Sequence, residues 1–365
     1  MSADRFAAVP EQPEAKRLLA AALAEGPAHA YLLHGPRGVG KTAAARAFAA
    51  ALLGDDERAL RERPTHPDLY VLERVGEMIR IDDIRELRHD LHMRPFEADR
   101  RVYLVADAHL MNEDAADALL KDLEEPPAYA TILLVADELG SLPETVRSRC
   151  QLVPFRRLSD AAVRDWLSEQ RPELDEVTRA AVARSSGGRL DRARKLLDEA
   201  AAERRLRLVE AARSVYLADD FDPAAAAAVV LDAMRGVGDE AKAREQDEVD
   251  RRDLTGRDAE QRVRRAQRGA EREELLASIE ALAAWYRDLV VVEAGAEHAA
   301  AHADRLDDLR SDVAAGAADG ADEAAAVARQ AWREAEEFNV NASLALEALF
   351  VRLQRAVRVA TPTRA

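Results

Sequence analysis

Short apolar runs alternate with amphipathic stretches through the first 156 residues. Bounded by polar residues and glycines, the apolar runs predict buried strands at 30–34, 69–72, 102–106 and 131–136. Apolar positions at helical spacing predict helices at 14–25, 42–53, 82–91 and 113–124. Because strands and helices alternate, we expect an α/β domain with a parallel sheet and helices on its faces.

The strand pattern stops after Phe155, and the rest of the chain is predicted to be helical. Several short helices are expected over 159–200, with a break at the Ser-Ser-Gly-Gly stretch 185–188, and longer helices over 205–358. Gly295 and the stretch 311–323 are expected to connect helices. A chain of 365 residues is too long for one compact core. The predicted domains are 1–156, 157–204 and 205–365.

Charge limits the partners that the chain can bind directly. The formal net charge is −16, and a protein this acidic repels a phosphate backbone at long range. Contact with DNA would therefore need a local basic track, helix N-termini or partner subunits. The stretch 239–274 mixes arginines with acidic residues. A solvated helix or a flexible excursion is favoured there over a nucleic-acid patch.

Cysteine usage and hydropathy exclude some classes of protein. Cys150 is the one cysteine of the sequence, so neither an internal disulfide nor a zinc site of several cysteines is possible. No apolar run approaches the ~18 residues of a membrane span. Residues 1–12 lack the basic and apolar regions of a signal peptide. We therefore expect a soluble, cytoplasmic protein that binds no membrane.

A glycine-rich loop lies between the strand at 30–34 and the helix at 42–53. It matches the phosphate-binding pattern GxxxxGK[ST] with Gly35, Pro36, Arg37, Gly38, Val39, Gly40, Lys41 and Thr42. Glycines let successive N–H groups point at phosphate oxygens, and the following helix presents its positive end to the same anion. Lys41 would reach the β- and γ-phosphates, and Thr42 would bind Mg²⁺. The pattern predicts nucleotide binding rather than a plain glycine turn.

The run Arg101–Asp107 supplies the second half of such a site. A buried apolar strand that ends in a carboxylate is typical of the Walker B motif, in which Asp107 would hold Mg²⁺ through water. Hydrolytic versions continue with a glutamate that orients the attacking water, whereas this chain continues with Ala108 and His109. A capping or packing role for His109 is favoured over a catalytic one. The site is therefore predicted to bind ATP and to cleave it poorly.

Several further elements occur in a fixed order and together resemble one family. They are His29–Leu32, His66–Asp68, Ile81–Arg85, the sequence ALLKDLEEPP at 118–127, and Ser148-Arg149-Cys150. This series resembles the AAA+ clamp-loader subunits of bacterial DNA polymerase III. The resemblance is dense over 10–156 and continues weakly through 188–193 and 341–347.

Two departures bear on the type of subunit that the chain resembles. The motor subunits, tau and gamma, carry Asp-Glu in Walker B and a cysteine zinc module after the P-loop helix. Ala108 at the glutamate position favours the delta-prime type. No cysteine lies between Thr42 and His66, which departs from the common form of both types. We therefore expect no zinc site in this chain. The sensor 1 position of the family falls near Ala136 or Asp137, where a small hydroxyl or amide is expected, and this also indicates weak hydrolysis.

The resemblance implies a fold and a function. The fold would be an AAA+ module over 1–156, a small helical lid over 157–204, and an all-α collar domain for oligomerisation over 205–365. The function would be that of the stationary subunit of the clamp loader, with ATP and Mg²⁺ as ligands. Its partners would be the tau/gamma motor subunits, the delta subunit, the sliding clamp and, through the assembled complex, primed DNA. Arg149 would act in trans as an arginine finger on ATP bound by a motor subunit.

Two groups of arginines have alternative interpretations. Arg189 and Arg192 both fit the lid arginine that contacts nucleotide in the family. A second group could face DNA, although a solvated helix face explains it equally well; its members are Arg80, Arg85, Arg88 and Arg94.

Three other functions compete with that of the stationary clamp-loader subunit. An ATP-hydrolysing motor subunit would carry a glutamate after Asp107. A structural scaffold that binds no nucleotide is disfavoured by the complete P-loop. An unrelated AAA+ remodelling protein is disfavoured by the joint occurrence of ALLKDLEEPP and Ser148-Arg149-Cys150. The sequence contains no polymerase active site of its own, since no second domain bears paired metal-binding carboxylates.

Overall fold

The computed structural model describes residues 5–61, 64–140, 142–251, 253–338 and 340–359. The chain divides into two compact units. Unit 1 comprises Met1–Glu173 and Gly188–Arg192, and unit 2 comprises Leu174–Gly187 and Ala193–Ala365. The three-domain division expected from the sequence stays a prediction.

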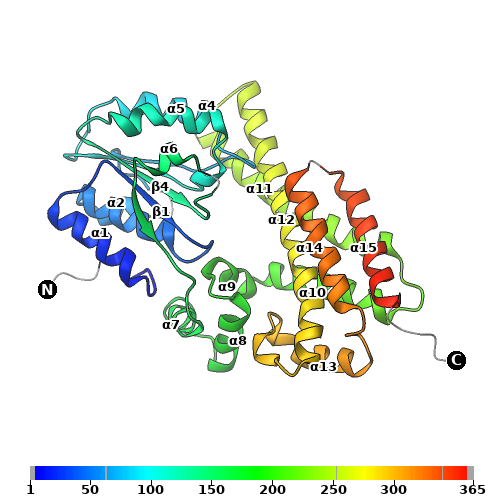
Figure 1. The fold of residues 1–365 in the computed structure, drawn as a ribbon. Helices are drawn as coiled ribbons and strands as arrows, with labels where there is room; N and C mark the ends of the chain where they lie inside the picture. Colours follow the sequence, from blue (N-terminus) through cyan, green and yellow to red (C-terminus); the bar gives the residue numbers. More distant parts are fainter. Residues whose placement is uncertain (1–4, 62–63, 141, 252, 339, 360–365) are drawn as a thin grey trace. The chain divides into compact units, whose positions relative to one another are not determined.

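Unit 1 is built around a parallel sheet (Figure 1). Its strands are β1 (Ala30–His34), β2 (Leu69–Leu72), β3 (Arg101–Val105), β4 (Ala130–Ala136) and β5 (Gln151–Pro154). The strand order is β2-β3-β4-β1-β5. All residues of the central strands β3 and β4 are buried, as expected where helices cover both faces of a sheet.

Unit 1 also contains helices, several of which cover the two faces of this sheet (Figure 1). They are α1 (Pro13–Glu25), α2 (Lys41–Leu53), α3 (Asp56–Ala59), α4 (Ile81–Leu91), α5 (Glu113–Glu124), α6 (Glu144–Arg147) and α7 (Asp160–Gln170), with a 3₁₀ turn η1 (Ala108–Leu110). Side chains of α4, α5 and α6 share one apolar core with β1, β3 and β4, whereas α2 packs Phe48 edge-on against Tyr31 of β1. Local signals start several helices: the side chain of Asn112 accepts from Ala115 N, which satisfies a free donor of α5.

Unit 2 is helical throughout its described residues. Its helices are α8 (Glu176–Ser186), α9 (Leu190–Leu197, which begins in unit 1), α10 (Glu199–Leu217), α11 (Pro223–Arg251), α12 (Arg257–Glu293), α13 (Leu306–Ala314), α14 (Ala321–Glu337) and α15 (Ala342–Val359). Two 3₁₀ turns, η2 (Glu297–Ala299) and η3 (Ala303–Arg305), lie between α12 and α13. The long helix α12 packs against α11, α13 and α14.

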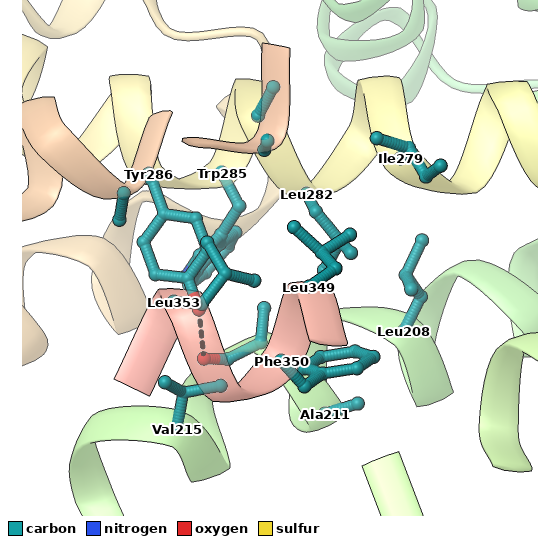
Figure 2. Close-up of a cluster of buried hydrophobic side chains, with 14 of the residues drawn as sticks. Leu208, Ala211, Val215, Ile279, Leu282, Trp285, Tyr286, Leu349, Phe350 and Leu353 are labelled. Atoms are coloured by element: carbon teal, nitrogen blue, oxygen red, sulfur yellow. Dashed lines mark hydrogen bonds between the residues drawn. The ribbon is translucent and has the colours of Figure 1, made fainter. Parts of the chain in front are cut away.

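The core of unit 2 combines a few large side chains with many alanines. Figure 2 shows Trp285 and Tyr286 of α12 facing Phe350 and Leu353 of α15, with residues of α10 beneath them. Tyr286 is fully buried and its hydroxyl donates to Ala212 O at 3.0 Å, drawn as the dashed line in Figure 2. Small residues on α14 let the helices approach closely around these rings.

Two buried carboxylates of unit 2 have hydrogen-bond partners. Asp312 of α13 is 2% exposed and accepts two hydrogen bonds from Arg213, at 2.8 and 2.9 Å, and one from the Tyr216 hydroxyl at 2.7 Å. Asp288 of α12 likewise accepts from the backbone N–H of His302. A buried carboxylate without such partners would cost several kcal/mol, so these pairs hold the helices in register.

The predicted fold class is confirmed: a parallel sheet with flanking helices is followed by a mostly helical region. The four predicted strands are present within one residue at each end. The fifth strand, Gln151–Pro154, was not predicted, because Val153 is its one buried residue and a four-residue run with one apolar inward position carries no periodic signal.

Two predicted connections differ from the structure. The stretch 311–323 was expected to be irregular, but α13 continues to Ala314 and α14 begins at Ala321, so the connection spans 315–320. Alanine favours helix, and Asp312 is held inside by Arg213, which extends α13 beyond the predicted end. The break at 185–188 begins two residues late, because α8 runs through Ser186 and Gly187 caps it at φ 60°.

The charged stretch 239–274 forms the end of α11 and the start of α12. The two segments pack through a small apolar cluster of Val249, Ala259 and Val263, which agrees with the solvated helix and not with the flexible excursion. Among the described residues, no helix is both long enough and apolar enough to cross a membrane.

Candidate functional site

The strand order of unit 1 brings the candidate site together. The ends of β1 and β4 are paired in register, His34 with Ala136, and Val105 at the end of β3 pairs with Leu134 of β4. In a parallel sheet the residues that follow such ends meet at one edge. Gly35, Asp107 and Asp137 follow β1, β3 and β4, so three segments far apart in the sequence meet there.

The P-loop has the backbone conformation that its glycines were expected to allow. Gly35, Gly38 and Gly40 have φ values of 138°, 75° and 97°, a region that other residues rarely adopt. A Cβ on Gly35 would lie 2.2 Å from the carbonyl oxygen of Phe155, because Phe155 N donates to His34 O and draws the end of β5 close. The loop therefore needs glycine at Gly35 for space as well as for φ.

Lys41 is the first residue of α2 and is almost completely buried, at 4% exposure. Its ammonium donates three hydrogen bonds: to Gly35 O at 2.7 Å, to Pro36 O at 2.6 Å and to Asp137 Oδ1 at 2.8 Å. An ammonium has three N–H groups, so each has an acceptor. Burial lowers the pKa of Lys41, while the neighbouring Asp137 opposes that shift.

The start of α2 leaves backbone donors available for an anion. The N-cap residue, Gly40, provides no side-chain cap. Within the part of the chain that the structure describes, the backbone N–H groups of Val39, Gly40 and Thr42 have no hydrogen-bond acceptor. Free N–H groups at the start of a 13-residue helix are what phosphate oxygens require. These residues therefore fit the phosphates of a nucleotide.

Asp107 lies just beyond β3 with φ 52°, an uncommon conformation for a residue other than glycine. Its carboxylate is paired with Arg74 Nε at 3.2 Å, and its side chain is 43% exposed. Thr42 is half-buried at the start of α2. Mg²⁺ prefers oxygen ligands, such as the hydroxyl of Thr42 and the carboxylate of Asp107. This pair therefore fits the cation that would accompany a nucleotide.

Asp137 and His109 complete the polar edge. The backbone N–H of Asp137 donates to His109 Nδ1 at 3.2 Å, and His109 Nε2 lies 3.7 Å from Asp137 Oδ2. Burial lowers the pKa of His109, which keeps the imidazole neutral at pH 7. One ligand atom each from Asp107, His109 and Asp137 lie within 4.8 Å of one another. Ala108, at the position of a hydrolytic glutamate, is fully buried.

Residues 188–192 of unit 1 close directly on the P-loop. Leu190 N donates to Gly38 O at 2.7 Å, and a Cβ on Gly38 would lie 1.8 Å from Asp191 Oδ1. Asp191 accepts hydrogen bonds from Arg189 and lies 3.6 Å from Arg37 Nε. Burial alone would raise the pKa of Asp191, but these two arginines hold it below its usual range. Of the two candidate lid arginines, Arg189 reaches Asp191 through its guanidinium, and the backbone of Arg192 also hydrogen-bonds to Asp191.

Arg149 follows α6 at the edge of unit 1. Its guanidinium donates to Thr145 O at 2.7 Å and pairs with Glu124, the last residue of α5. Glu124 belongs to ALLKDLEEPP and Arg149 to Ser148-Arg149-Cys150, so two elements of the family resemblance meet in space. Burial raises the pKa of the Cys150 thiol to about 12, which keeps it neutral.

The arginines that could face DNA have different environments. Arg88 pairs with Asp122, whose side chain is 2% exposed, so this arginine already neutralises a buried carboxylate. Arg85 pairs with Asp82 on the surface of α4 and its side chain is 64% exposed. The hypothesis that this group faces DNA stays a prediction.

A hollow of about 310 Å³ lies next to the N-terminal segment of unit 1. Val9 and Pro10 line it from one side and Trp166 of α7 from the other. Val9 is also the nearest neighbour of Gly40, since a Cβ on Gly40 would lie 3.4 Å from Val9 Cγ1. The hollow therefore lies beside the P-loop segment.

The structure brings most of the predicted site residues together. The P-loop, Asp107 and Asp137 share one edge of the sheet, whereas Arg149 lies apart, beside α5. Sequence reasoning did not single out Arg74 or Asp191. Neither belongs to a recognisable pattern, and the contacts that give them a place in the site span 33 and more than 150 positions of sequence.

Comparison with known proteins agrees with this geometry. Residues 11–159 match the family model described as DNA polymerase III, delta subunit. The chain is 34% identical over 201 residues to DNA polymerase III subunit delta' of Pseudomonas aeruginosa, which is 52% of this chain and 61% of that protein. It is 34% identical over 152 residues to the delta' subunit of Bacillus subtilis, 39% of this chain and 46% of that protein.

Other relatives include motor-type subunits. The tau subunit of Bacillus subtilis is 30% identical over 189 residues, covering 47% of this chain and 33% of that protein. Among solved structures, a gamma subunit-related protein from Thermotoga maritima aligns with 94% of this chain and all of its own, with 17% identity and a TM-score of 0.41.

The chain thus spans about three fifths, or less, of the length of these curated relatives. The family match lies within unit 1, where the P-loop, Asp107 and the paired Glu124 and Arg149 also lie. Over this region the chain is similar to the delta' and other clamp-loader subunits of bacterial DNA polymerase III.

Proposed function

We propose that this protein is the stationary, delta-prime-like subunit of a DNA polymerase III clamp loader in the cytoplasm. It binds ATP with Mg²⁺, hydrolyses it slowly or not at all, and assembles with tau/gamma motor subunits and a delta subunit. The assembled complex loads the sliding clamp onto primed DNA. The observation that carries the proposal is the pairing of Arg149 with Glu124, which joins the two sequence elements most specific to the family.

The site supports nucleotide binding with little turnover. Backbone N–H groups at the start of α2 and the ammonium of Lys41 suit the phosphates, and Thr42 and Asp107 offer oxygens for Mg²⁺. Hydrolysis needs a group that orients water, and the position after Asp107 is the buried methyl group of Ala108. His109 is neutral and already accepts a hydrogen bond from Asp137 N. The chain therefore binds ATP without an effective base.

Arg149 suits a role in trans. Its side chain is 31% exposed, and its acidic partner Glu124 is 49% exposed. An exposed ion pair of this kind is worth at most about 1 kcal/mol, so phosphate oxygens of a neighbouring subunit can replace the carboxylate. The guanidinium remains oriented by Thr145 O during that exchange. Glu124 thus keeps the finger in place in the free subunit.

Unit 2 supports the role of an oligomerisation domain. Several of its large apolar side chains are exposed, including Leu217 at 50%, Phe338 at 56% and Leu344 at 66%. Apolar side chains at a subunit interface become buried on assembly, which favours association. The collar domain over 205–365 and the lid over 157–204 belong to this proposal.

The proposal is tested by reconstitution with the motor and delta subunits, the clamp and primed DNA. An arginine finger contributes about 10³-fold or more to turnover at the site that it serves. R149A should therefore stop hydrolysis at the ATP site of the neighbouring motor subunit. DNA-stimulated hydrolysis and clamp loading by the complex should fall, while the complex still assembles. The control is R156A, which removes an arginine of unit 1 that is 84% exposed.

Two results would contradict parts of the proposal. Loss of assembly in R149A, with unchanged turnover per assembled complex, would show that Arg149 is an assembly contact. Substantial hydrolysis by the isolated chain would favour the motor type, with His109 or another group in place of the missing glutamate.

A further inference from the structure

Asp137 is one of the two residues predicted near the sensor 1 position of the family, where a small hydroxyl or amide is expected. It follows the buried strand β4, and its Oδ1 accepts from Lys41 Nζ at 2.8 Å. Lys41 is the residue of a P-loop that reaches the β- and γ-phosphates. The carboxylate therefore lies against the ammonium that a terminal phosphate would have to reach.

Other positive charges near this carboxylate already have acidic partners. Arg74 pairs with Asp107, and Arg37 and Arg189 pair with Asp191. His109, which also faces Asp137, is neutral. Among the described residues, Lys41 is thus the one cation paired with Asp137. If Lys41 turns to a γ-phosphate, Asp137 loses its partner and faces a second anion.

The β- and γ-phosphates of a nucleotide would have different neighbours at this site. The β-phosphate is bound mainly by P-loop N–H groups and the start of α2, which are free to donate here. The γ-phosphate lies beyond it, towards the residues that follow β3 and β4. Asp107 and Asp137 stand there, with carboxylate oxygens within 4.8 Å of each other. Lys41 donates three hydrogen bonds, so it can turn one N–H from a carbonyl oxygen to a β-phosphate and keep another on Asp137. A γ-phosphate would instead lie against the carboxylates themselves and compete with Asp137 for the ammonium.

We propose that Asp137 is a specificity-determining residue that makes this P-loop hold a nucleoside diphosphate in preference to a triphosphate. The inference rests on the proposed nucleotide binding and deepens it. ATP still binds, but ADP binds more tightly, and the stationary subunit carries diphosphate for most of its working cycle. A subunit that holds mainly diphosphate has little use for a hydrolytic glutamate, which agrees with Ala108 at that position.

The test is titration calorimetry of the full chain with ADP and with ATP, in excess Mg²⁺ and again in a chelator. A like charge a few ångströms from the terminal phosphate, partly screened by solvent, should favour ADP by about tenfold in Mg²⁺ and by more without it. D137N keeps the shape and removes the charge. It should tighten ATP binding by about tenfold and leave ADP within about twofold. D117N, which removes an exposed carboxylate of α5, is the matched control and should leave the ratio unchanged.

The outcomes separate this inference from the function on which it rests. Equal binding of ATP and ADP by the natural chain would overturn the selectivity and leave nucleotide binding in place. Weaker ATP binding in D137N would also overturn it, because Asp137 would then be a cation ligand that aids the triphosphate. Binding of neither nucleotide, in the natural chain and in D137N alike, would refute the proposed nucleotide site itself. Thermal melting of D137N at the temperature of the natural chain confirms that the variant is folded.

Discussion

The P-loop of unit 1 and a buried network of unit 2 treat their polar groups in opposite ways. In unit 2 the buried carboxylate of Asp312 has three hydrogen-bond donors from Arg213 and Tyr216. In unit 1 the N–H groups of Val39, Gly40 and Thr42 have no acceptor within the described residues. Polar groups that only support a fold are paired inside it, whereas those that bind a ligand must stay available. The comparison therefore points to unit 1 as the binding unit and to unit 2 as a scaffold.

The two units also differ in what holds them together. Strands of unit 1 are fixed by backbone pairing, and the residue after β5 passes so close to the end of β1 that Gly35 has no room for a Cβ. Helices of unit 2 meet mainly through side chains, with Trp285, Tyr286 and Phe350 at the centre (Figure 2). One backbone contact is also close there, since a Cβ on Gly320 would lie 2.4 Å from the carbonyl oxygen of Ala356. A Cβ added at the crowded strand end should therefore disturb unit 1 strongly, and loss of a buried, paired side chain should disturb unit 2.

The largest effect is expected for Gly35→Ala. Its new Cβ would lie 2.2 Å from the carbonyl oxygen of Phe155 at a φ of 138°, so strain and overpacking add to about 4 kcal/mol of lost stability in unit 1. Urea unfolding followed by the fluorescence of Trp166 measures the loss. Gly140→Ala is the control, because a Cβ there meets nothing within 4 Å. Equal effects of the two variants would contradict the role of backbone contact.

A smaller effect is expected for Asp312→Ala in unit 2. Removing the carboxylate leaves Arg213 and Tyr216 without their buried acceptor, which should cost about 3 kcal/mol. Urea unfolding of a Trp166→Phe background, followed by the fluorescence of Trp285 and Trp332, reports this unit.

The control for that experiment lies on the same helix. Asp307 has a side chain that is 99% exposed and pairs with Arg310 at the surface, so Asp307→Ala should change stability by less than about 1 kcal/mol. If Asp307→Ala costs as much as Asp312→Ala, the buried network does not hold α13 in place.

The smallest effect, and one of opposite sign, is expected for Gly236→Ala. This glycine lies inside α11, and a Cβ there would meet nothing within 4 Å. Alanine should stabilise unit 2 by about 0.8 kcal/mol, because glycine is a poor helix former. The midpoint of urea unfolding in the Trp166→Phe background measures the gain. A loss of stability would mean that unit 2, like unit 1, depends on its glycine for backbone contact.

The local pattern of the sequence was enough to predict most of the secondary structure and the phosphate-binding loop. Residues 30–34 are uniformly apolar until His34, and the next eight residues carry the glycines and the lysine of the loop. Such signals lie within a dozen residues and need no distant partner. Ala108 was also visible in the sequence, and with it the expectation of weak hydrolysis.

Tertiary structure alone decided which groups meet at the site. Lys41 and Asp137 lie 96 positions apart, and Gly38 and Asp191 lie more than 150 apart, so no periodic pattern relates the members of either pair. The first contact depends on the strand order β2-β3-β4-β1-β5, and the second depends on the way residues 188–192 pack onto the P-loop. The sequence by itself therefore determined that this protein has a phosphate-binding loop and a sheet to carry it. The contact between Asp137 and Lys41 follows from tertiary packing. Strand pairing joins residues that are distant in the sequence, and local propensity does not predict such pairs.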